Sequence, residues 1–233
     1  MESGAAADQR TEQGSGHALW ALWGVAAGAL GIVATLLTDP SRGLDEDVVR
    51  GGAALIDRLD RTTYHLGVVA GFFTVLCVLF AAAGWRRWAA RVAPESLPAR
   101  VVSLALTASA GAMMLGYGFK GSLAVYLNGG IDAGAHAREG LYGVYMFLDF
   151  GPYVAWWGAA IAATAMAWLS LRDRLLPRWI GVVSTLFALV PVAVLVATGL
   201  PGFPGVVDQA WLLIVSLGIV LRRPAATRRP TAP

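Results

Sequence analysis

Hydrophobic residues occur along this chain in long runs that are separated by short charged or proline-containing stretches. Six runs can be delimited, at residues 18–38, 66–84, 101–119, 153–170, 179–200 and 206–221. About 20 apolar residues in a helix cross the hydrocarbon core of a bilayer. The runs are rich in Ala, Leu and Gly and lack the period-two alternation of a membrane-spanning strand. The pattern therefore predicts an all-α fold, a polytopic bundle of six transmembrane helices.

Composition supports a membrane protein. Of the 233 residues, 57% are hydrophobic and 14% are charged, against about 45–50% and about 25% in soluble domains. Six crossings with their loops fill the chain and leave no room for a separate soluble domain. We expect an N-terminal tail at 1–17, one membrane domain at 18–221 with an outer loop at 39–62, and a basic tail at 222–233.

The arginines predict the orientation. They are concentrated in the tails and in the loops after the second and fourth runs, whereas those of the first long loop are diluted by acidic residues. Because positive charge marks cytoplasmic loops, both termini are expected in the cytoplasm. The net charge of +3 is spread over these short segments, so it indicates topology and not a nucleic-acid partner.

The first outer loop has the pattern of an amphipathic helix. Its apolar positions include Leu44, Val48, Leu55 and Leu59, which fall on one helical face. Glu46 with Arg50 and Asp57 with Arg61 have the i,i+4 spacing of ion pairs on a helix. We expect this segment either to pack over the mouth of the bundle or to act as a mobile lid.

Small residues predict close helix packing. Gly24 with Gly28, and Gly158 with Ala162, have the small-xxx-small spacing that lets membrane helices approach. The contacts could lie within one chain or between the subunits of a homo-oligomer.

Ionisable residues at membrane depth are the candidates for chemistry, because each is costly to insert. Lys120 lies about 28 Å along its helix from Val101, near the outer interface, where it either snorkels or serves a site. Asp149 falls at the outer boundary of the fourth crossing and Asp208 lies close to the outer end of the sixth. Asp208 follows the stretch 201–205, which two prolines and two glycines should keep out of regular helix.

These residues suggest an outward-facing polar vestibule. His65, Tyr117 and Tyr145 are expected at the same level, so a substrate-binding set would comprise Lys120, Asp149, Asp208, His65, Tyr145 and Tyr117. His65 is either an interfacial hydrogen-bonding group or part of a proton relay. Lys120 is expected to form an ion pair with Asp149 or with Asp208, because pairing offsets part of the cost of burying each charge.

No cofactor is predicted. The histidines and carboxylates show no local metal-ligand spacing, and the chain has no P-loop, nucleophile elbow or Rossmann glycine motif.

Motifs in the C-terminal part carry a family resemblance. They are 141–143 (Leu-Tyr-Gly), 156–157 (Trp-Trp), the basic turn 172–176 followed by 177–181 (Pro-Arg-Trp-Ile-Gly), and 211–213 (Trp-Leu-Leu). Over about the last 95 residues the chain resembles a large family of six-helix integral membrane proteins of bacteria, whose function is unknown. The resemblance implies a multi-pass protein of the bacterial inner membrane and implies no catalytic residues.

Three hypotheses for function remain open at this point. The first is a protein that binds or transports a small or amphipathic molecule through the vestibule. The second is a membrane enzyme acting on a lipid or isoprenoid, with Asp149 and Asp208 as acid and base. The third is a regulatory or assembly subunit.

Overall fold

The structure of the chain, a computed structural model, describes residues 19–38, 52–148 and 151–221. Within these ranges it contains helices and no strand, which confirms the all-α fold class. The elements are α2 (Ala21–Leu37), η1 (Gly52–Arg58, a 3-10 helix), α4 (Arg61–Val92), α5 (Leu97–Tyr126), α6 (Arg138–Leu148), α7 (Gly151–Val154), α8 (Trp157–Leu171), α9 (Arg178–Thr198) and α10 (Pro204–Val220).

Four stretches are long and apolar enough to cross a membrane. They are α4, α5, the stretch Arg138–Leu171 that comprises α6 to α8, and α9. The helices α2 and α10 are apolar but have 17 residues each, which corresponds to about 25 Å. Both tails and most of the outer loop expected at 39–62 lie outside the described residues.

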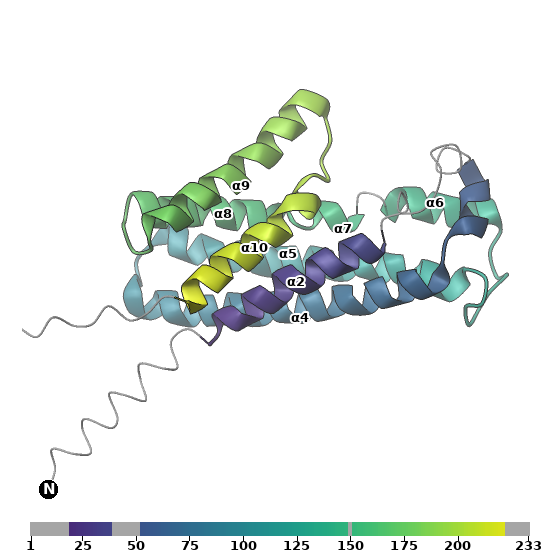
Figure 1. Ribbon diagram of the computed structural model, residues 1–233, viewed down its shortest axis with the longest axis horizontal. Helices are drawn as coiled ribbons and strands as arrows, with labels where there is room; N and C mark the ends of the chain where they lie inside the picture. The colour runs from purple at the N-terminus through teal and green to yellow at the C-terminus, as the bar shows by residue number, and fades with distance from the viewer. Residues whose placement is uncertain (1–18, 39–51, 149–150, 222–233) are drawn as a thin grey trace, which may run out of the picture.

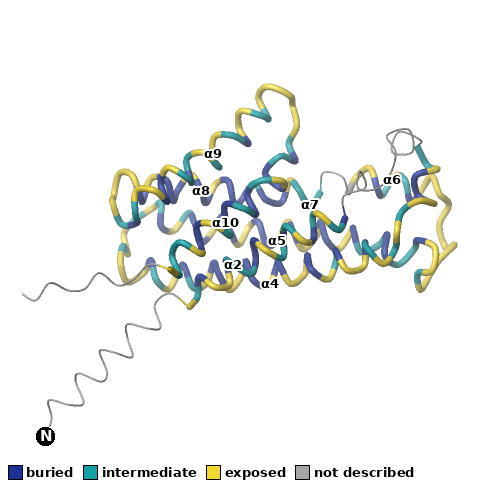
Figure 2. The backbone as a smooth tube through the Cα atoms, viewed as in Figure 1, coloured by how far each residue is buried: buried dark blue, intermediate teal, exposed yellow. Residues whose placement is uncertain are grey.

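The helices form an elongated bundle, and the hairpin of α4 and α5 runs along its long axis (Figure 1). α2 packs against α4 and α10, α5 packs against α8, and α8 packs against α9. α9 diverges from the rest of the bundle, and a short turn returns the chain to α10 (Figure 1). Figure 2 shows the consequence: much of the far half of α9 is exposed, whereas the helices beside it alternate buried and exposed positions.

The α4–α5 hairpin is longer than the apolar runs that predict it. Asp60 caps α4 by accepting hydrogen bonds from the backbone N–H groups of Thr62 and Thr63. Ser96 caps α5, where a proline also stands in the first turn, as is favoured there. At the other end of α4 the Trp85 indole donates to the Ala99 carbonyl across 2.8 Å, which ties the two helices together where they turn.

A second hydrophobic cluster covers the other end of the hairpin. Leu55 and Ile56 of η1 are buried there with Tyr64, Leu123, Ala124, Leu127, Leu141 and Tyr145. The described part of the outer loop therefore packs against the bundle. It does so as a 3-10 helix that ends at Arg58 and not as a continuous amphipathic α-helix.

The expected ion pair between Asp57 and Arg61 is wrong. Because η1 ends before Arg61, the two residues do not lie on one helix. Asp57 instead accepts from Arg138 of α6 at 2.8 Å, and the Arg61 guanidinium donates to the Ala124 carbonyl at 3.0 Å. Both contacts fasten the outer cluster to neighbouring elements.

Close helix contacts occur within the chain at the predicted glycines. A Cβ added at Gly28 would lie 2.6 Å from the backbone oxygen of Gln209 in α10. One added at Gly158 would lie 2.2 Å from the backbone oxygen of Ala105 in α5. Only a residue without a side chain lets the backbones of these helices approach so closely. The intramolecular alternative is confirmed at these two positions.

Replacing Gly28 by alanine should lower the free energy of unfolding by about 1–3 kcal/mol, because the methyl group meets backbone that cannot rotate away. Gly118→Ala is the matched control, since a Cβ at Gly118 of α5 meets open space; it should be neutral or slightly stabilising. Thermal unfolding in detergent measures both. Equal midpoints for the two variants would contradict the close α2–α10 contact.

The Asp60 cap should make the stability depend on pH. The Thr63 hydroxyl, helped by the backbone N–H groups of Thr63 and Thr62, donates to the carboxylate and holds the pKa of Asp60 below its ordinary value. A carboxyl group with a lowered folded-state pKa stabilises above its unfolded pKa of about 3.9 and loses that contribution as the pH falls through the folded value.

Asp60→Ala should therefore cost about 1 kcal/mol at neutral pH, and the loss should shrink in acid below the unfolded pKa. Asp60→Asn keeps a capping oxygen without the charge, so it should recover part of the Asp60→Ala loss at neutral pH and should not show the same change in acid. Thermal melts across this range are the measurement; a loss that does not change with pH would contradict a cap that depends on the charge.

Candidate functional site

The interior of the bundle contains a chain of polar side chains that starts on α2. Thr35 and Thr38 lie one turn apart at the end of this helix. The Thr35 hydroxyl accepts from the Gln209 amide of α10 at 2.6 Å. The Thr38 hydroxyl accepts from the Lys120 ammonium of α5 and donates to the Ala34 carbonyl at 2.7 Å. The helices α5 and α10, which are far apart in the sequence, are thus each hydrogen-bonded to a threonine of this segment, and the two threonines lie one turn apart.

Lys120 is buried, with 4% of its surface exposed. Its ammonium lies 5.3 Å from the centroid of the Tyr153 ring, within the range of a cation–π contact. A snorkelling lysine extends its ammonium to the polar interface, whereas the side chain of Lys120 is enclosed by other parts of the protein. The hydroxyl of Thr38 and the face of Tyr153 surround the charge inside the protein.

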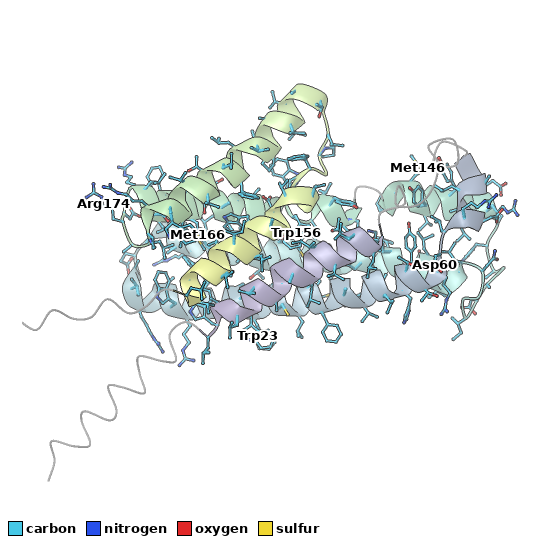
Figure 3. The ribbon with its side chains drawn as sticks, in the orientation of Figure 1. Trp23, Asp60, Met146, Trp156, Met166 and Arg174 are labelled. Carbon is cyan, nitrogen blue, oxygen red and sulfur yellow. The ribbon has the colours of Figure 1, made fainter. Side chains whose placement is uncertain are left out.

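Tyr153 belongs to a group of three interacting aromatic residues, which also includes Tyr117 and Trp156. The ring of Tyr117, on α5, packs where a Cβ at Gly71 of α4 would stand. The Tyr117 hydroxyl hydrogen-bonds with the Trp156 side chain and interacts electrostatically with Tyr153. Trp156 reaches α2, because its ring is 2.8 Å from a Cβ added at Gly31. Figure 3 shows Trp156 in the middle of the bundle, with Asp60 and Arg174 at opposite ends.

A break between α7 and α8 produces this arrangement. The N–H of Ala159 bonds to the Trp156 carbonyl at 2.8 Å, so the carbonyl of Ala155 loses the partner that a continuous α-helix would give it. The Ser109 hydroxyl of α5 donates to that carbonyl instead. Irregular backbone at membrane depth needs such a partner from the protein. Tyr153 and Trp156 therefore do not lie on one continuous helix with α8.

Asp208, like the indole N–H of Trp20, is an exception to this satisfied interior. It is fully buried on α10, and neither carboxylate oxygen has a hydrogen-bond partner in the part of the chain that the structure describes. The neighbouring Gln209 donates to both Thr35 and the Gly205 carbonyl. Two adjacent polar residues on one helix thus differ completely in how they are accommodated.

Helical geometry explains the difference. Residues three or four apart share a helix face. Asp208 therefore lies on the same face of α10 as Gly205 and Trp211, whereas Gln209 faces α2. A Cβ at Gly205 would lie 2.4 Å from the Cα of Tyr153 in α7. The Trp211 indole donates to Ser184 of α9 at 3.0 Å. Asp208 therefore lies on the side of α10 turned towards α7 and α9.

The turn before α10 is shorter than expected. Residues 201–203 form a turn, but Pro204 begins the helix and Gly205 lies within it. Proline fits the first helical turn because its missing N–H has no helical partner there. The indole of Trp157 donates to the Pro201 carbonyl at 2.8 Å and holds the turn against α8.

The structure brings only some of the predicted site residues together. Lys120 and Tyr117 are both buried on α5, whereas Tyr145 lies in the second hydrophobic cluster, where it stacks on Tyr142. His65 is exposed in the second turn of α4. Asp149 lies outside the described residues, so its ion pair with Lys120 stays a prediction. The alternative pair of Lys120 with Asp208 does not form.

Sequence reasoning missed Thr35 and Thr38. Threonine in a membrane helix usually bonds back to its own backbone, as Thr38 does, and so gives no sign of a further partner. The available signal is their spacing: two hydroxyl groups one turn apart at the end of an apolar run.

No match is found when the chain is compared with protein-family models, with curated proteins and with solved structures. The site is therefore interpreted from its own geometry.

Lys120 and Thr38 should be energetically coupled. Thr38→Val removes the acceptor and leaves a buried ammonium with one partner fewer, whereas in a Lys120→Met background the same change should cost little. We expect a coupling energy of about 1–3 kcal/mol, as for hydrogen bonds to charged groups. A double-mutant cycle from unfolding in detergent measures it. Thr107 gives the control, because among the described residues its hydroxyl bonds only to the Ser103 carbonyl. Thr107→Val and Lys120→Met should be additive within about 0.5 kcal/mol.

Proposed function

We propose that the chain is an integral protein of the bacterial inner membrane that crosses it six times, with both termini in the cytoplasm. The four long apolar stretches support four crossings. α2 and α10 would supply the others: they pack against each other, and their length of about 25 Å needs only slight local thinning of a bilayer about 30 Å thick. The distribution of the arginines supports the orientation.

We further propose that Asp208 binds a small amphipathic cation. The observation that carries the proposal is a fully buried carboxyl group without a hydrogen-bond partner in the described ranges. A carboxyl group in such surroundings is stable when it holds a proton or pairs with a cation. Residues this costly in a membrane helix usually mark a pathway for ions or substrates.

The surroundings of Asp208 favour a cation with apolar substituents. Tyr153 packs against Gly205, one turn before Asp208, and Trp211 follows one turn after it. Aromatic faces and one carboxylate together recognise organic cations. In the proposed topology Asp208 lies in the outer leaflet, so the cation would arrive from the outer side. The carboxyl group would release one proton for each cation that it binds.

Tetraphenylphosphonium is a suitable probe, because it is a permanent cation with aromatic substituents. The wild-type protein in detergent should bind it and release protons into weakly buffered solution, which a pH indicator dye detects. Asp208→Asn should lose at least about tenfold in affinity, as expected when a buried charge pair is removed. Asp173→Asn removes the same charge from an exposed position in the α8–α9 turn and should bind like the wild type.

Stability gives an independent test. Because no described hydrogen bond is lost, Asp208→Asn should unfold at the same temperature as the wild type or higher, as is common where a functional group is held at a cost to stability. A clear loss of stability would make Asp208 a structural residue. Unchanged binding by Asp208→Asn, or no binding of the probe by the wild type, would reject the cation site.

A further inference from the structure

A cavity lies between α4 and α5 at their turn, at the end of the hairpin opposite to Asp60. Its volume is about 980 Å³, and both helices and the connecting residues line it. Pockets of about 300–1,000 Å³ are typical of small-molecule sites. It is remote from the polar chain around Thr38, which joins the other end of α2.

Alanines create the hollow. Ala82, Ala89 and Ala99 line it and are buried, so they form its floor, while Ala83 and Ala90 are exposed at its wall. On a helix pair with larger residues at these positions the side chains would fill the space. Beneath the floor the Trp85 bond to the Ala99 carbonyl keeps the helices at a fixed separation.

The polar part of the lining is basic. Arg86 and Arg87 are exposed on α4, and neither makes a hydrogen bond or an ion pair with any residue that the structure describes. Arg100 of α5 donates to the Pro94 carbonyl at 2.7 Å and lies 3.5 Å from the carboxylate of Glu95. The cavity thus holds three positive charges against one acidic group at its rim.

The hydroxyl groups in the lining are already committed. Ser103 donates to the Arg100 carbonyl at 3.0 Å, and Thr107 donates to the Ser103 carbonyl at 2.8 Å. The donors left for a ligand are therefore guanidinium groups, whose planar N–H pairs match the oxygens of a phosphate.

We propose that this cavity binds the phosphate headgroup of an anionic phospholipid. Arg86 and Arg87 bind the phosphate, and the first segment of an acyl chain lies along the apolar wall. Leu79 and Leu104 belong to that wall and are 39% and 68% exposed, so the apolar side of the cavity continues onto the membrane-facing surface of α4 and α5. A soluble anion would gain nothing from this wall, which is why the occupant is a lipid.

The inference depends on the placement of α4 and α5 in a membrane. It does not depend on Asp208, and the two proposals have separate measurements, so either can fail alone.

Native mass spectrometry of the full chain, titrated with phosphatidylglycerol or phosphatidylcholine, tests the site. Phosphatidylglycerol should bind with higher affinity than the zwitterionic lipid. The double variant Arg86→Gln and Arg87→Gln should lose about tenfold or more in affinity for phosphatidylglycerol, as expected from losing charge-assisted hydrogen bonds. Millimolar inorganic phosphate should leave binding unchanged.

Two further variants distinguish lipid binding in the cavity from non-specific attraction of the lipid by positive charge. Arg91→Gln with Arg178→Gln removes two exposed arginines, from the end of α4 and the start of α9, that do not line the cavity; affinity should stay within about twofold of the wild type. Ala90→Trp fills the cavity from its exposed wall without changing charge and should weaken the binding of both lipids.

Three results would overturn the proposal. An equal loss in the two double arginine variants would show that charge near the interface is sufficient. Unchanged binding by Ala90→Trp would show that the lipid does not enter the cavity. Displacement by inorganic phosphate would make the site one for a soluble anion.

Discussion

Polar groups inside this bundle depend on one another, because a buried polar group without a hydrogen-bond partner is costly. The bonds that meet this demand run between helices that are distant in the sequence. The Thr38 hydroxyl accepts a hydrogen bond from Lys120, the Ser109 hydroxyl donates one to the Ala155 carbonyl, and the Ser184 hydroxyl accepts one from Trp211. Each bond fixes the rotation of one helix against another more specifically than apolar packing does. Gly28 lets α2 and α10 approach closely, and this places the Gln209 amide of α10 within hydrogen-bond distance of Thr35 on α2.

The sequence was sufficient to predict the helical class and to single out Lys120 and Asp208, since a charge within an apolar run is conspicuous without any structure. Their partners were not predictable. The pairing expected between them fails because α10 turns Gln209, and not Asp208, towards α2. Helix lengths were underestimated because the ends of an apolar run are not the ends of a helix. α4 and α5 continue through polar residues to caps at Asp60 and Ser96.

The two proposed sites differ in how they accommodate charge. Arg86 and Arg87, in the cavity at the α4–α5 turn, are exposed, so they cost the fold little while no ligand is bound. Asp208 is solvated by nothing comparable among the described residues. An interior carboxyl group held in this way lowers the stability of the bundle, and selection for a function would explain why a leucine or valine does not occupy the position.

Because α4 is so long, two parts of the molecule should differ in the heat-capacity change of unfolding and in their response to urea. Its 32 residues extend about 48 Å, and fitting them within a core about 30 Å thick would need a tilt above about 50°, beyond the usual range. One end therefore emerges, and the cluster around Leu55 and Tyr145 covers the end at Asp60. Its burial removes apolar surface from water, so its opening should carry a positive heat-capacity change and respond to urea. Helices that separate within a membrane exchange protein contacts for lipid contacts, so their separation should show a smaller heat-capacity change and a weaker response to urea.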